Sequence, residues 1–245
     1  MCVSIILHNY IKDYPLIIAN NRDENIDRNF SPPMILGRSP LIVGGLDMLK
    51  HGTWLGINSS GIVINLLNKW KADKPFTGSN DYKSRGLLVL ELLKELNVKN
   101  IIKLIKKITQ DSYLPFYLIL SDIKNVFFVE FDEYINIVDI SNQNFIAGNL
   151  DPFSNWEKFE IGKALIDSIK VKEIFSVRKV LKRLLKYQKG DFNIPSSDYS
   201  VNLGNFQTTS STILEINSNK VNYFFSNGKP LNTDYQDYSY LLKGA

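Results

Sequence analysis

Residues 1–24, MCVSIILHNYIKDYPLIIANNRDE, contain two short apolar runs followed by a polar cluster. The runs at residues 3–7 and 15–19 are rich in β-branched side chains, and a turn-forming sequence separates them. This pattern predicts two strands joined by a turn, so we expect the N-terminus to begin a sheet. We expect the polar cluster, residues 20–24, to follow the second strand at the point where the chain leaves the sheet.

Further strands and helices are indicated along the rest of the chain. Three more hairpins are predicted around the turn-forming clusters at residues 58–61, 121–125 and 217–220. Apolar residues spaced three and four apart predict helices over residues 87–92, 101–108, 156–169 and 177–185. This order favours two sheets flanked by helices over alternating βαβ units. We therefore predict one α+β domain over residues 1–245, with a long loop over residues 190–205.

The composition is that of an ordinary globular protein, with 44% hydrophobic and 22% charged residues among 245. A net charge of +4 is too weak to imply a nucleic-acid or membrane partner. We find neither a secretory signal nor the run of about 18 apolar residues that a membrane-spanning helix requires. The single cysteine excludes an intramolecular disulfide. We therefore expect a cytoplasmic protein without a membrane span.

The lone cysteine, Cys2, directly follows Met1, and its small size makes removal of the initiator methionine an expectation. Cys2 would then carry a nucleophilic thiol beside its own α-amine, whose pKa of about 8 allows it to accept a proton near neutral pH. The alternative is that Cys2 is only a small apolar strand residue.

Two charged residues of the polar cluster are candidate partners of Cys2. If the first two strands pair as a hairpin, the end of the second strand returns to the level of Cys2, where Arg22 and Asp23 could reach the amine and the thiol. The aspartate could hold the protonated amine, and the arginine would favour the thiolate. The alternative is a solvated turn with a surface ion pair worth about 0–1 kcal/mol.

The remaining candidate sites carry weaker signals. The two histidines, His8 and His51, lack carboxylates at metal-ligand spacing, so we expect surface or turn residues and no metal or other cofactor. The basic stretch at residues 170–189 could meet an acidic membrane or nucleic acid, but a solvated helix face is the preferred interpretation. Trp54 and Trp70 could line a binding site, although aromatic residues around hairpins more often belong to the core.

Several motifs together resemble a known family. They are Met1-Cys2, residues 21–24 (NRDE), residues 44–47 (GGLD), residues 52–58 (GTWLGIN), Ser84-Arg85-Gly86, Gly148-Asn149 and Trp156-Glu157-Lys158. This combination resembles the NRDE-motif family of transport-and-Golgi-organisation-2-like proteins. The family is similar to cysteine-type N-terminal-nucleophile (Ntn) hydrolases, which include penicillin acylases and bile-salt hydrolases. The resemblance implies a four-layer αββα sandwich of two antiparallel sheets flanked by helices.

The resemblance also implies roles for individual residues. It makes Cys2 the nucleophile, Arg22 and Asp23 its polarising partners, and Asn68 and Asn149 candidate donors to an oxyanion. A donor of this kind is worth roughly 2.7–4 kcal/mol in the transition state. The alternative for Asn68 is a hairpin-end residue, and for Asn149 an Asx turn. The residues assigned to substrate binding are Asn21, Glu24, Trp54 and Thr209.

One departure from the family pattern separates two functions. Cysteine acylases carry a late arginine at the active site, whereas Thr209 is the nearest counterpart in this sequence. The first hypothesis is an amidohydrolase that cleaves a non-peptide C–N bond of a small-molecule acyl amide through an acyl-cysteine intermediate. The alternative is a non-catalytic binding or trafficking protein for haem or lipid that uses the same site. The sequence leaves the oligomeric state open.

Overall fold

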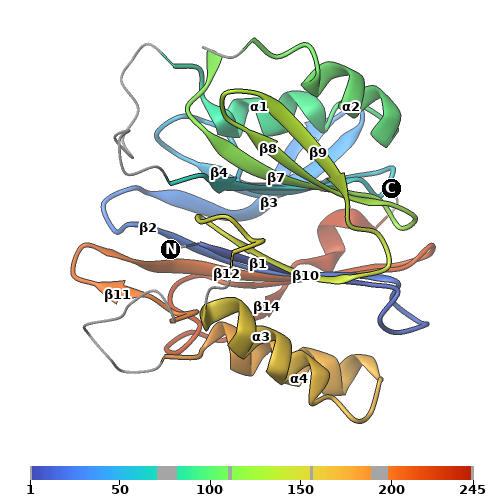
Figure 1. Cartoon of the computed structure of the whole chain (residues 1–245), viewed down its shortest axis with the longest axis vertical. Helices are drawn as coiled ribbons and strands as arrows, with labels where there is room; N and C mark the ends of the chain where they lie inside the picture. Colours follow the sequence, from blue (N-terminus) through green and yellow to red (C-terminus); the bar gives the residue numbers. More distant parts are fainter. Residues whose placement is uncertain (1, 71–81, 110–111, 155–156, 189–197, 244–245) are drawn as a thin grey trace. The chain divides into compact units, whose positions relative to one another are not determined.

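The computed structural model describes residues 2–70, 82–109, 112–154, 157–188 and 198–243. The chain forms two compact units: unit 1 comprises Met1–Asp27 with Asn142–Ser239, and unit 2 comprises Arg28–Ser141 with Tyr240–Ala245. Within the described residues, each unit contains one antiparallel sheet and one pair of α-helices (Figure 1). The predicted α+β class with two antiparallel sheets is confirmed. The expectation of a single domain over residues 1–245 stays a prediction.

The sheet of unit 1 places the N-terminal strand between two partners. Its strand order is β10-β1-β2-β12-β13-β14, and β11 pairs with β12. The strands are β1 (Val3–His8), β2 (Leu16–Asn25), β10 (Asn144–Gly148), β11 (Asn202–Leu203), β12 (Phe206–Ile216), β13 (Val221–Ser226) and β14 (Gln236–Asp237). The predicted hairpin of the first two strands is confirmed, because β1 and β2 pair antiparallel from Val3 opposite Asn21 to His8 opposite Leu16.

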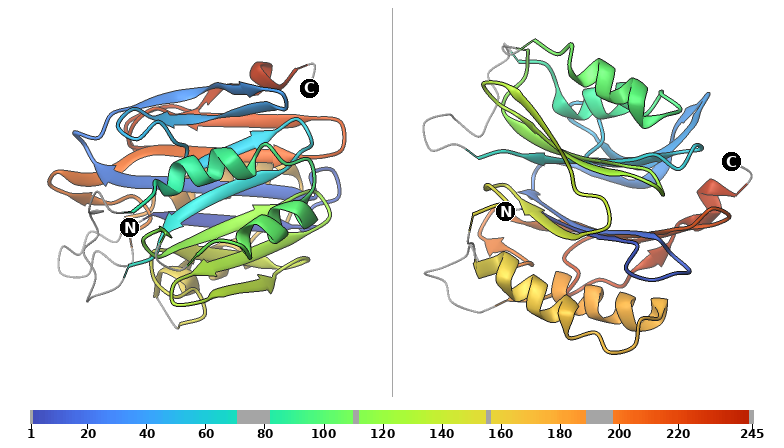
Figure 2. Two further views of the ribbon diagram at one scale, coloured as in Figure 1. Left: turned by 90° about the horizontal axis from the view of Figure 1, so that it is seen from above. Right: turned by 45° about the vertical axis from the view of Figure 1, so that its right-hand side comes forward.

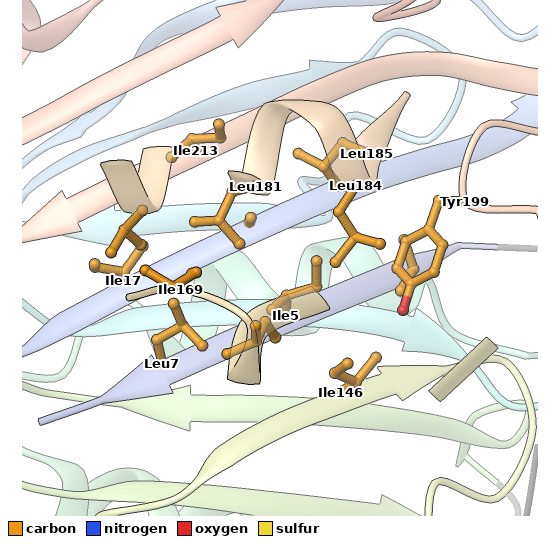
Figure 3. Packing of buried hydrophobic residues seen from close by; sticks show 14 of the residues in the cluster. Ile5, Leu7, Ile17, Ile146, Ile169, Leu181, Leu184, Leu185, Tyr199 and Ile213 are labelled. Atoms are coloured by element: carbon orange, nitrogen blue, oxygen red, sulfur yellow. The ribbon is translucent and has the colours of Figure 1, made fainter. Parts of the chain in front are cut away.

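Two helices cover one face of this sheet, α3 (Glu157–Asp167) and α4 (Ile174–Leu185). Figure 3 shows Leu181, Leu184 and Leu185 of α4 directed towards apolar side chains of the strands. Ile5, Leu7 and Ile17 are among the strand residues of this core, and all are fully buried. Burial of each such side chain contributes about 1.5–3 kcal/mol, so this face of the sheet is fixed in register by its core.

Unit 2 has a seven-stranded sheet in sequential order, β3-β4-β5-β6-β7-β8-β9. The strands are β3 (Phe30–Arg38), β4 (Leu41–Asp47), β5 (Leu55–Asn58), β6 (Val63–Asn68), β7 (Phe116–Ser121), β8 (Val126–Phe131) and β9 (Ile135–Asp139). Its helices, α1 (Arg85–Leu92) and α2 (Val98–Ile105), lie over one face of the sheet (Figure 2). Ser84 and Asn97 cap them by accepting hydrogen bonds from backbone amides, as N-cap side chains do.

The prediction that the polar cluster at residues 20–24 follows the second strand is wrong. Asn20 to Glu24 do not follow the second strand but lie inside β2, which continues to Asn25. The reason is that β12 pairs along the whole of β2, from Ile216 opposite Leu16 to Phe206 opposite Asn25. Ladder hydrogen bonds from a strand almost 200 residues away therefore hold a polar sequence that by itself is typical of a loop.

Other sequence expectations are corrected or confirmed locally. His8 is buried, and its Nδ1 accepts a hydrogen bond from the backbone amide of Asn142 at 2.8 Å, so the expectation of a surface residue is wrong. His51 is exposed in a turn with a φ of 55°, as expected. The expected loop at residues 190–205 falls partly outside the described residues and includes β11 at its end.

The basic helix α4 is not simply solvated. Arg178 donates to both carboxylate oxygens of the fully buried Glu215 at 2.5 Å, so this part of the basic face is held by an ion pair with the sheet. The ammonium group of Lys182 lies 4.8 Å from the ring centroid of Tyr235. No helix in the described parts of the chain is long and apolar enough to cross a membrane.

Candidate active site

Strand register in unit 1 brings the candidate residues to the N-terminal end of β1. Val3 lies opposite Asn21 of β2 on one side and opposite Gly148 of β10 on the other. Cys2, one residue before the strand, is therefore flanked by the next residues of both neighbours. These are Arg22 of β2 and Asn149, the residue that follows β10. The hairpin geometry expected from the sequence thus brings Cys2, Arg22 and Asp23 together.

The thiol of Cys2 is held by the backbone of Asp23. Its sulfur accepts a hydrogen bond from the Asp23 amide at 3.2 Å, and the thiol donates to the Asp23 carbonyl at 3.4 Å. Burial of the thiol, followed by the negative charge of Asp23, raises the pKa of Cys2 to about 11. We expected Arg22 to favour the thiolate, but the surroundings as a whole favour the neutral thiol.

Arg22 is buried, with 5% of its surface exposed, and its guanidinium is engaged by two neighbours. It donates to Thr209 Oγ1 at 2.9 Å and lies 3.8 Å from a carboxylate oxygen of Glu24. The Thr209 hydroxyl also donates to the Arg22 carbonyl at 3.2 Å. A residue buried and bonded in this way is not part of a solvated turn, so the surface interpretation of Arg22 is wrong.

Asp23 is equally buried, with 4% of its surface exposed, and it accepts a short hydrogen bond from the hydroxyl of Thr208 at 2.6 Å. Thr208 is itself fixed, because its Oγ1 accepts from the backbone amide of Val201 at 2.8 Å. A buried carboxylate held by a positioned hydroxyl retains a fixed direction. Thr208 was not singled out in the sequence, where it reads as one residue of a polar strand.

A β-bulge in β12 lies beside this pair of charges. Thr208 pairs with Asp23 and Ser210 pairs with Arg22, so Thr209 is the additional residue of the bulged strand. Bulges of this kind redirect side chains locally. Here the two adjacent threonines each bond a different member of the Arg22–Asp23 pair.

The two other β2 residues assigned to substrate binding make structural contacts. Asn21 donates from its side-chain amide to the carbonyls of Leu185 and Tyr199, both at 2.9 Å, and it is fully buried. These bonds tie β2 to the end of α4. Glu24 is half-buried, contacts Arg22 and accepts from the amide of Asn25 at 3.0 Å. Substrate contact by Asn21 and Glu24 stays a prediction.

Asn149 is 1% exposed and follows β10 directly, next to the level of Cys2. Asn68, the second candidate oxyanion donor, is the last residue of β6 in unit 2 and is half-buried. The assignments of both residues as oxyanion donors stay predictions.

Trp54 also belongs to unit 2, where it packs against glycine backbone. A Cβ atom added to Gly45 would lie 2.4 Å from the Trp54 ring, and one added to Gly44 would lie 2.6 Å from the Leu55 carbonyl. The ring of Phe30 meets Trp54 edge-on with centroids 5.7 Å apart. The paired glycines of the GGLD motif therefore provide space for close packing. A substrate-binding role for Trp54 stays a prediction.

The structure adds a buried lysine that sequence reasoning did not single out as a site residue. Lys158, in the first turn of α3, has 0% of its surface exposed. Burial lowers its pKa, whereas the negative charges of Asp23, Cys2 and Asp198 act in the opposite direction. The motif Trp156-Glu157-Lys158 marked this position in the sequence, but it assigned no role to the lysine, and lysines on amphipathic helices are usually solvated.

No group of three or more His, Cys, Asp and Glu side chains in the described ranges could hold a metal ion. Two of the motif residues quoted from the sequence, Met1 and Trp156, lie outside the described residues. Removal of Met1 therefore stays an expectation.

Comparison with solved structures identifies the class of fold. Penicillin V acylase from Agrobacterium tumefaciens matches with a TM-score of 0.61 and 16% identity, covering 100% of this chain and 89% of that one. An N-acylethanolamine-hydrolyzing acid amidase orthologue from Caenorhabditis elegans matches with a TM-score of 0.59 and 12% identity, covering 87% of this chain and 92% of that one. A mutant conjugated bile acid hydrolase from Clostridium perfringens matches with a TM-score of 0.53 and 12% identity, covering 100% and 95%. The chain has the Ntn-hydrolase fold.

Sequence comparison gives the family. The profile described as Transport and Golgi organisation 2 matches residues 1–227, which include both units almost completely. The chain belongs to this family, as the motifs in its sequence indicated. A search of curated protein sequences finds no significant match.

Proposed function

We propose that this protein is an Ntn-type amidohydrolase that cleaves a non-peptide C–N bond through an acyl-cysteine intermediate. The observation that carries the proposal is the position of Cys2, whose sulfur accepts a hydrogen bond from the Asp23 amide at 3.2 Å. The Asp23 carboxylate beside it is buried and held by Thr208. The Ntn-hydrolase fold supports the same reaction class.

The first half of the proposed reaction forms a thioester. With Met1 removed, the Cys2 α-amine takes the thiol proton, and the sulfur attacks the carbonyl carbon of the substrate amide. The resulting tetrahedral intermediate carries a negative oxygen, to which Asn149 is the proposed donor. The C–N bond then breaks, and the leaving amine receives the proton that the α-ammonium group held.

The second half regenerates the thiol. The α-amine accepts a proton from water, whose oxygen attacks the thioester carbon, and the C–S bond breaks to release a carboxylic acid. The proton returns to the Cys2 sulfur. Asp23 is proposed to hold the α-ammonium group in both halves, since a buried carboxylate favours a nearby cation.

Intact-mass spectrometry tests the proposal directly. The protein is incubated with an N-acylethanolamine, penicillin V or a conjugated bile acid, the amide classes named for the structural relatives. We expect a chain that begins at Cys2, a mass increase equal to one acyl group, and release of the free acid. Retention of Met1 by the natively processed protein, or absence of acylation by all amides offered, would contradict the proposal. Cys2→Ala is the control for acylation elsewhere.

A second candidate is a binding or trafficking protein for haem or lipid. It is favoured by Thr209, the nearest counterpart of the late arginine that cysteine acylases carry at the active site. The hydroxyl of Thr209 contacts Arg22. A hydroxyl cannot replace a fixed cation in holding a carboxylate or an oxyanion. Saturable ligand binding that survives Cys2→Ala, with no turnover by the parent protein, would support this candidate in place of the hydrolase.

A further inference from the structure

We propose that the face of α4 turned away from its sheet is a docking surface for an anionic lipid bilayer. The cations of this face contact the negatively charged headgroups, and Phe175 enters the edge of the apolar region. The surface belongs to unit 1 alone. It goes beyond the proposed function and does not depend on it, because its residues take no part in the proposed reaction.

The first observation is a local excess of positive charge around α4. Residues 170–188 carry seven Lys and Arg side chains and one acidic side chain, Glu173. This excess is larger than the net charge of +4 of the whole chain, so the rest of the sequence is net negative. Clusters of about four to eight Lys and Arg side chains on an amphipathic helix are typical of binding to anionic lipid. The weak net charge of the whole chain therefore conceals a strongly basic segment.

The second observation is the placement of these cations on one side of α4. The opposite side is apolar and packs into the core of unit 1, as Figure 3 shows for Leu181 and Leu184. Side chains spaced three and four residues apart lie in a row along one face of a helix. In α4 and its C-cap these are Phe175, Lys179, Lys182, Arg183 and Lys186, here called the α4 row. The row is accessible, because each of its members is exposed or half-buried.

The third observation is an apolar end to this basic row. Phe175 has 74% of its surface exposed, and Val171, in the connection from α3, has 53% exposed. Exposed apolar side chains beside cations are the composition of an interfacial helix, in which the apolar groups enter the bilayer edge. An aromatic ring alone could also stack on a nucleic-acid base, but a valine has no ring for stacking. The pair therefore favours lipid over nucleic acid as the partner.

The cations of the α4 row also repel one another. Burial lowers the pKa of Lys182, and the charges of Arg178 and Lys186 lower it further. Glu215 and Asp234 act in the opposite direction, but both carboxylate oxygens of Glu215 already accept hydrogen bonds from Arg178. An anionic surface would relieve this repulsion, because it brings negative charge to all of the cations at once.

Helix α2 of unit 2 provides a comparison within the same molecule. It carries exposed lysines with a similar spacing at residues 99, 103 and 106, and an exposed Leu96 precedes its N-cap. Four residues before Lys99 stands the acidic Glu95, whereas Phe175 stands four residues before Lys179. Cations near a helix C-terminus are stabilised by the helix dipole, which accounts for basic residues in both helices. It does not account for an exposed aromatic ring at the start of the α4 row.

Vesicle sedimentation with the full chain tests the proposal. Partition is measured on phosphatidylcholine vesicles with and without phosphatidylserine, at low and high ionic strength. We expect binding to the phosphatidylserine vesicles that weakens with salt, because salt screens the attraction. Loss of one cation should weaken partition by about fivefold, so the double variant Lys179→Gln with Arg183→Gln should bind about 25-fold more weakly.

Lys99→Gln with Lys103→Gln is the matched control. It removes two exposed lysines four residues apart from α2 and changes the net charge by the same amount. Its partition should stay close to that of the parent. Equal losses in the two double variants, or no binding of the parent to phosphatidylserine vesicles, would overturn the proposal. Binding of the parent to a single-stranded RNA but to neither vesicle would also overturn it and would assign the α4 row to nucleic acid.

A fluorescent label tests the entry of Phe175 into the bilayer. Cys2→Ala removes the sole cysteine of the chain, so Phe175→Cys in that background supplies one site for an environment-sensitive fluorophore. We expect its emission to move to shorter wavelength on phosphatidylserine vesicles, whereas a label introduced through Lys99→Cys should keep its emission. Unchanged emission at residue 175 would overturn the proposal. Absence of amide hydrolysis would reject the proposed function alone, because none of these readouts depends on turnover.

Discussion

Two lysines, one in each unit, show opposite ways of burying a cation. Lys69 of unit 2 keeps 16% of its side chain exposed and contacts the carboxylates of Glu130 and Asp132, each at 2.6 Å. Burial opposes its charge, but these two hydrogen-bonded carboxylates raise its pKa overall. Lys158 of unit 1 is fully buried, and for it burial prevails and the pKa is lowered.

This difference separates a lysine that stabilises the fold from a lysine whose protonation state depends on the charges near it. A cation between two carboxylates in direct contact stays charged and holds strands together, here β8 and the end of β6. A cation whose charge is opposed by burial responds to changes in the charges nearby. Perturbed groups of this second kind cluster at functional sites, and in this protein Lys158 shares unit 1 with Cys2 and Asp23. We therefore expect unit 1 residues to take part in the reaction. We expect Lys69, Glu130 and Asp132, here called the Lys69 cluster, to contribute to stability.

The largest effect is expected at Cys2. Cys2→Ser should abolish formation of the acyl-enzyme in the intact-mass assay, because a serine hydroxyl has a far higher pKa than a thiol and is a weaker nucleophile in the same position. The thermal midpoint should change little, since the two side chains are nearly the same size. Acylation of Cys2→Ser at the parent rate would show that the Cys2 thiol is not required for acylation.

The next effect is expected at Asn149. If its amide donates to the tetrahedral oxyanion, Asn149→Ala should lower kcat by about 10²–10³ and leave KM nearly unchanged, because the bond forms mainly in the transition state. Asn20→Ala is the control: Asn20 is also buried beside β1, where its amide donates to the Val3 carbonyl at 2.9 Å. That variant should lose stability while keeping kcat. A purely structural Asn149 would behave in the same way.

A smaller effect tests the Lys69 cluster. Lys69→Met leaves two partly buried carboxylates side by side, so we expect the free energy of unfolding to fall by about 1–3 kcal/mol, somewhat less than for a fully buried pair. Lys158→Met also removes a cation that acts on the buried Asp23 carboxylate, but it relieves the unfavourable burial of the ammonium group, so we expect a smaller loss than in Lys69→Met. Urea denaturation of both variants measures the contrast. Equal losses would show that the two lysines do not differ as described.

The smallest effect is expected at Asp23. Removing its charge in Asp23→Asn should lower the pKa of the Cys2 thiol from about 11, so the pH profile of its alkylation by iodoacetamide moves to lower pH. A shift of one unit corresponds to about tenfold faster alkylation below the midpoint. Acyl transfer should fall in the same variant because Asp23 no longer holds the α-amine. Faster alkylation with slower acylation is a combination that a solvated turn residue would not produce.

Much of the local structure could be predicted from the sequence. The β1–β2 hairpin followed from two β-branched runs around a turn, and its register then placed Cys2 next to Asp23. The helices of both units followed from apolar spacing. The Ntn-hydrolase fold was implied by the family resemblance and is matched by the solved structures.

The features that escaped prediction depend on distant parts of the chain. β3 contains Pro32 and Pro33 and shows no clean alternation, so it gave no strand signal. The continuation of β2 through Asp23 needs β12 as its partner, and Thr208 is identified only once that pairing is known. Burial of Lys158 depends on Tyr199, 41 residues away. Local pattern cannot report any of these, because in each case tertiary contact overrides local preference.

The bulge in β12 has a consequence for how this sequence tolerates insertions and deletions. Thr208 pairs with Asp23 and Ser210 pairs with Arg22, so a chain without Thr209 would continue the ladder in the same register and keep Thr208 opposite Asp23. It would lose the Thr209 hydroxyl, which accepts from the Arg22 guanidinium and donates to the Arg22 carbonyl. A one-residue deletion here should act like the loss of a site residue, whereas a conservative replacement of Thr209 by serine should be tolerated. The number of residues in this strand is therefore as important for the site as the identity of those residues.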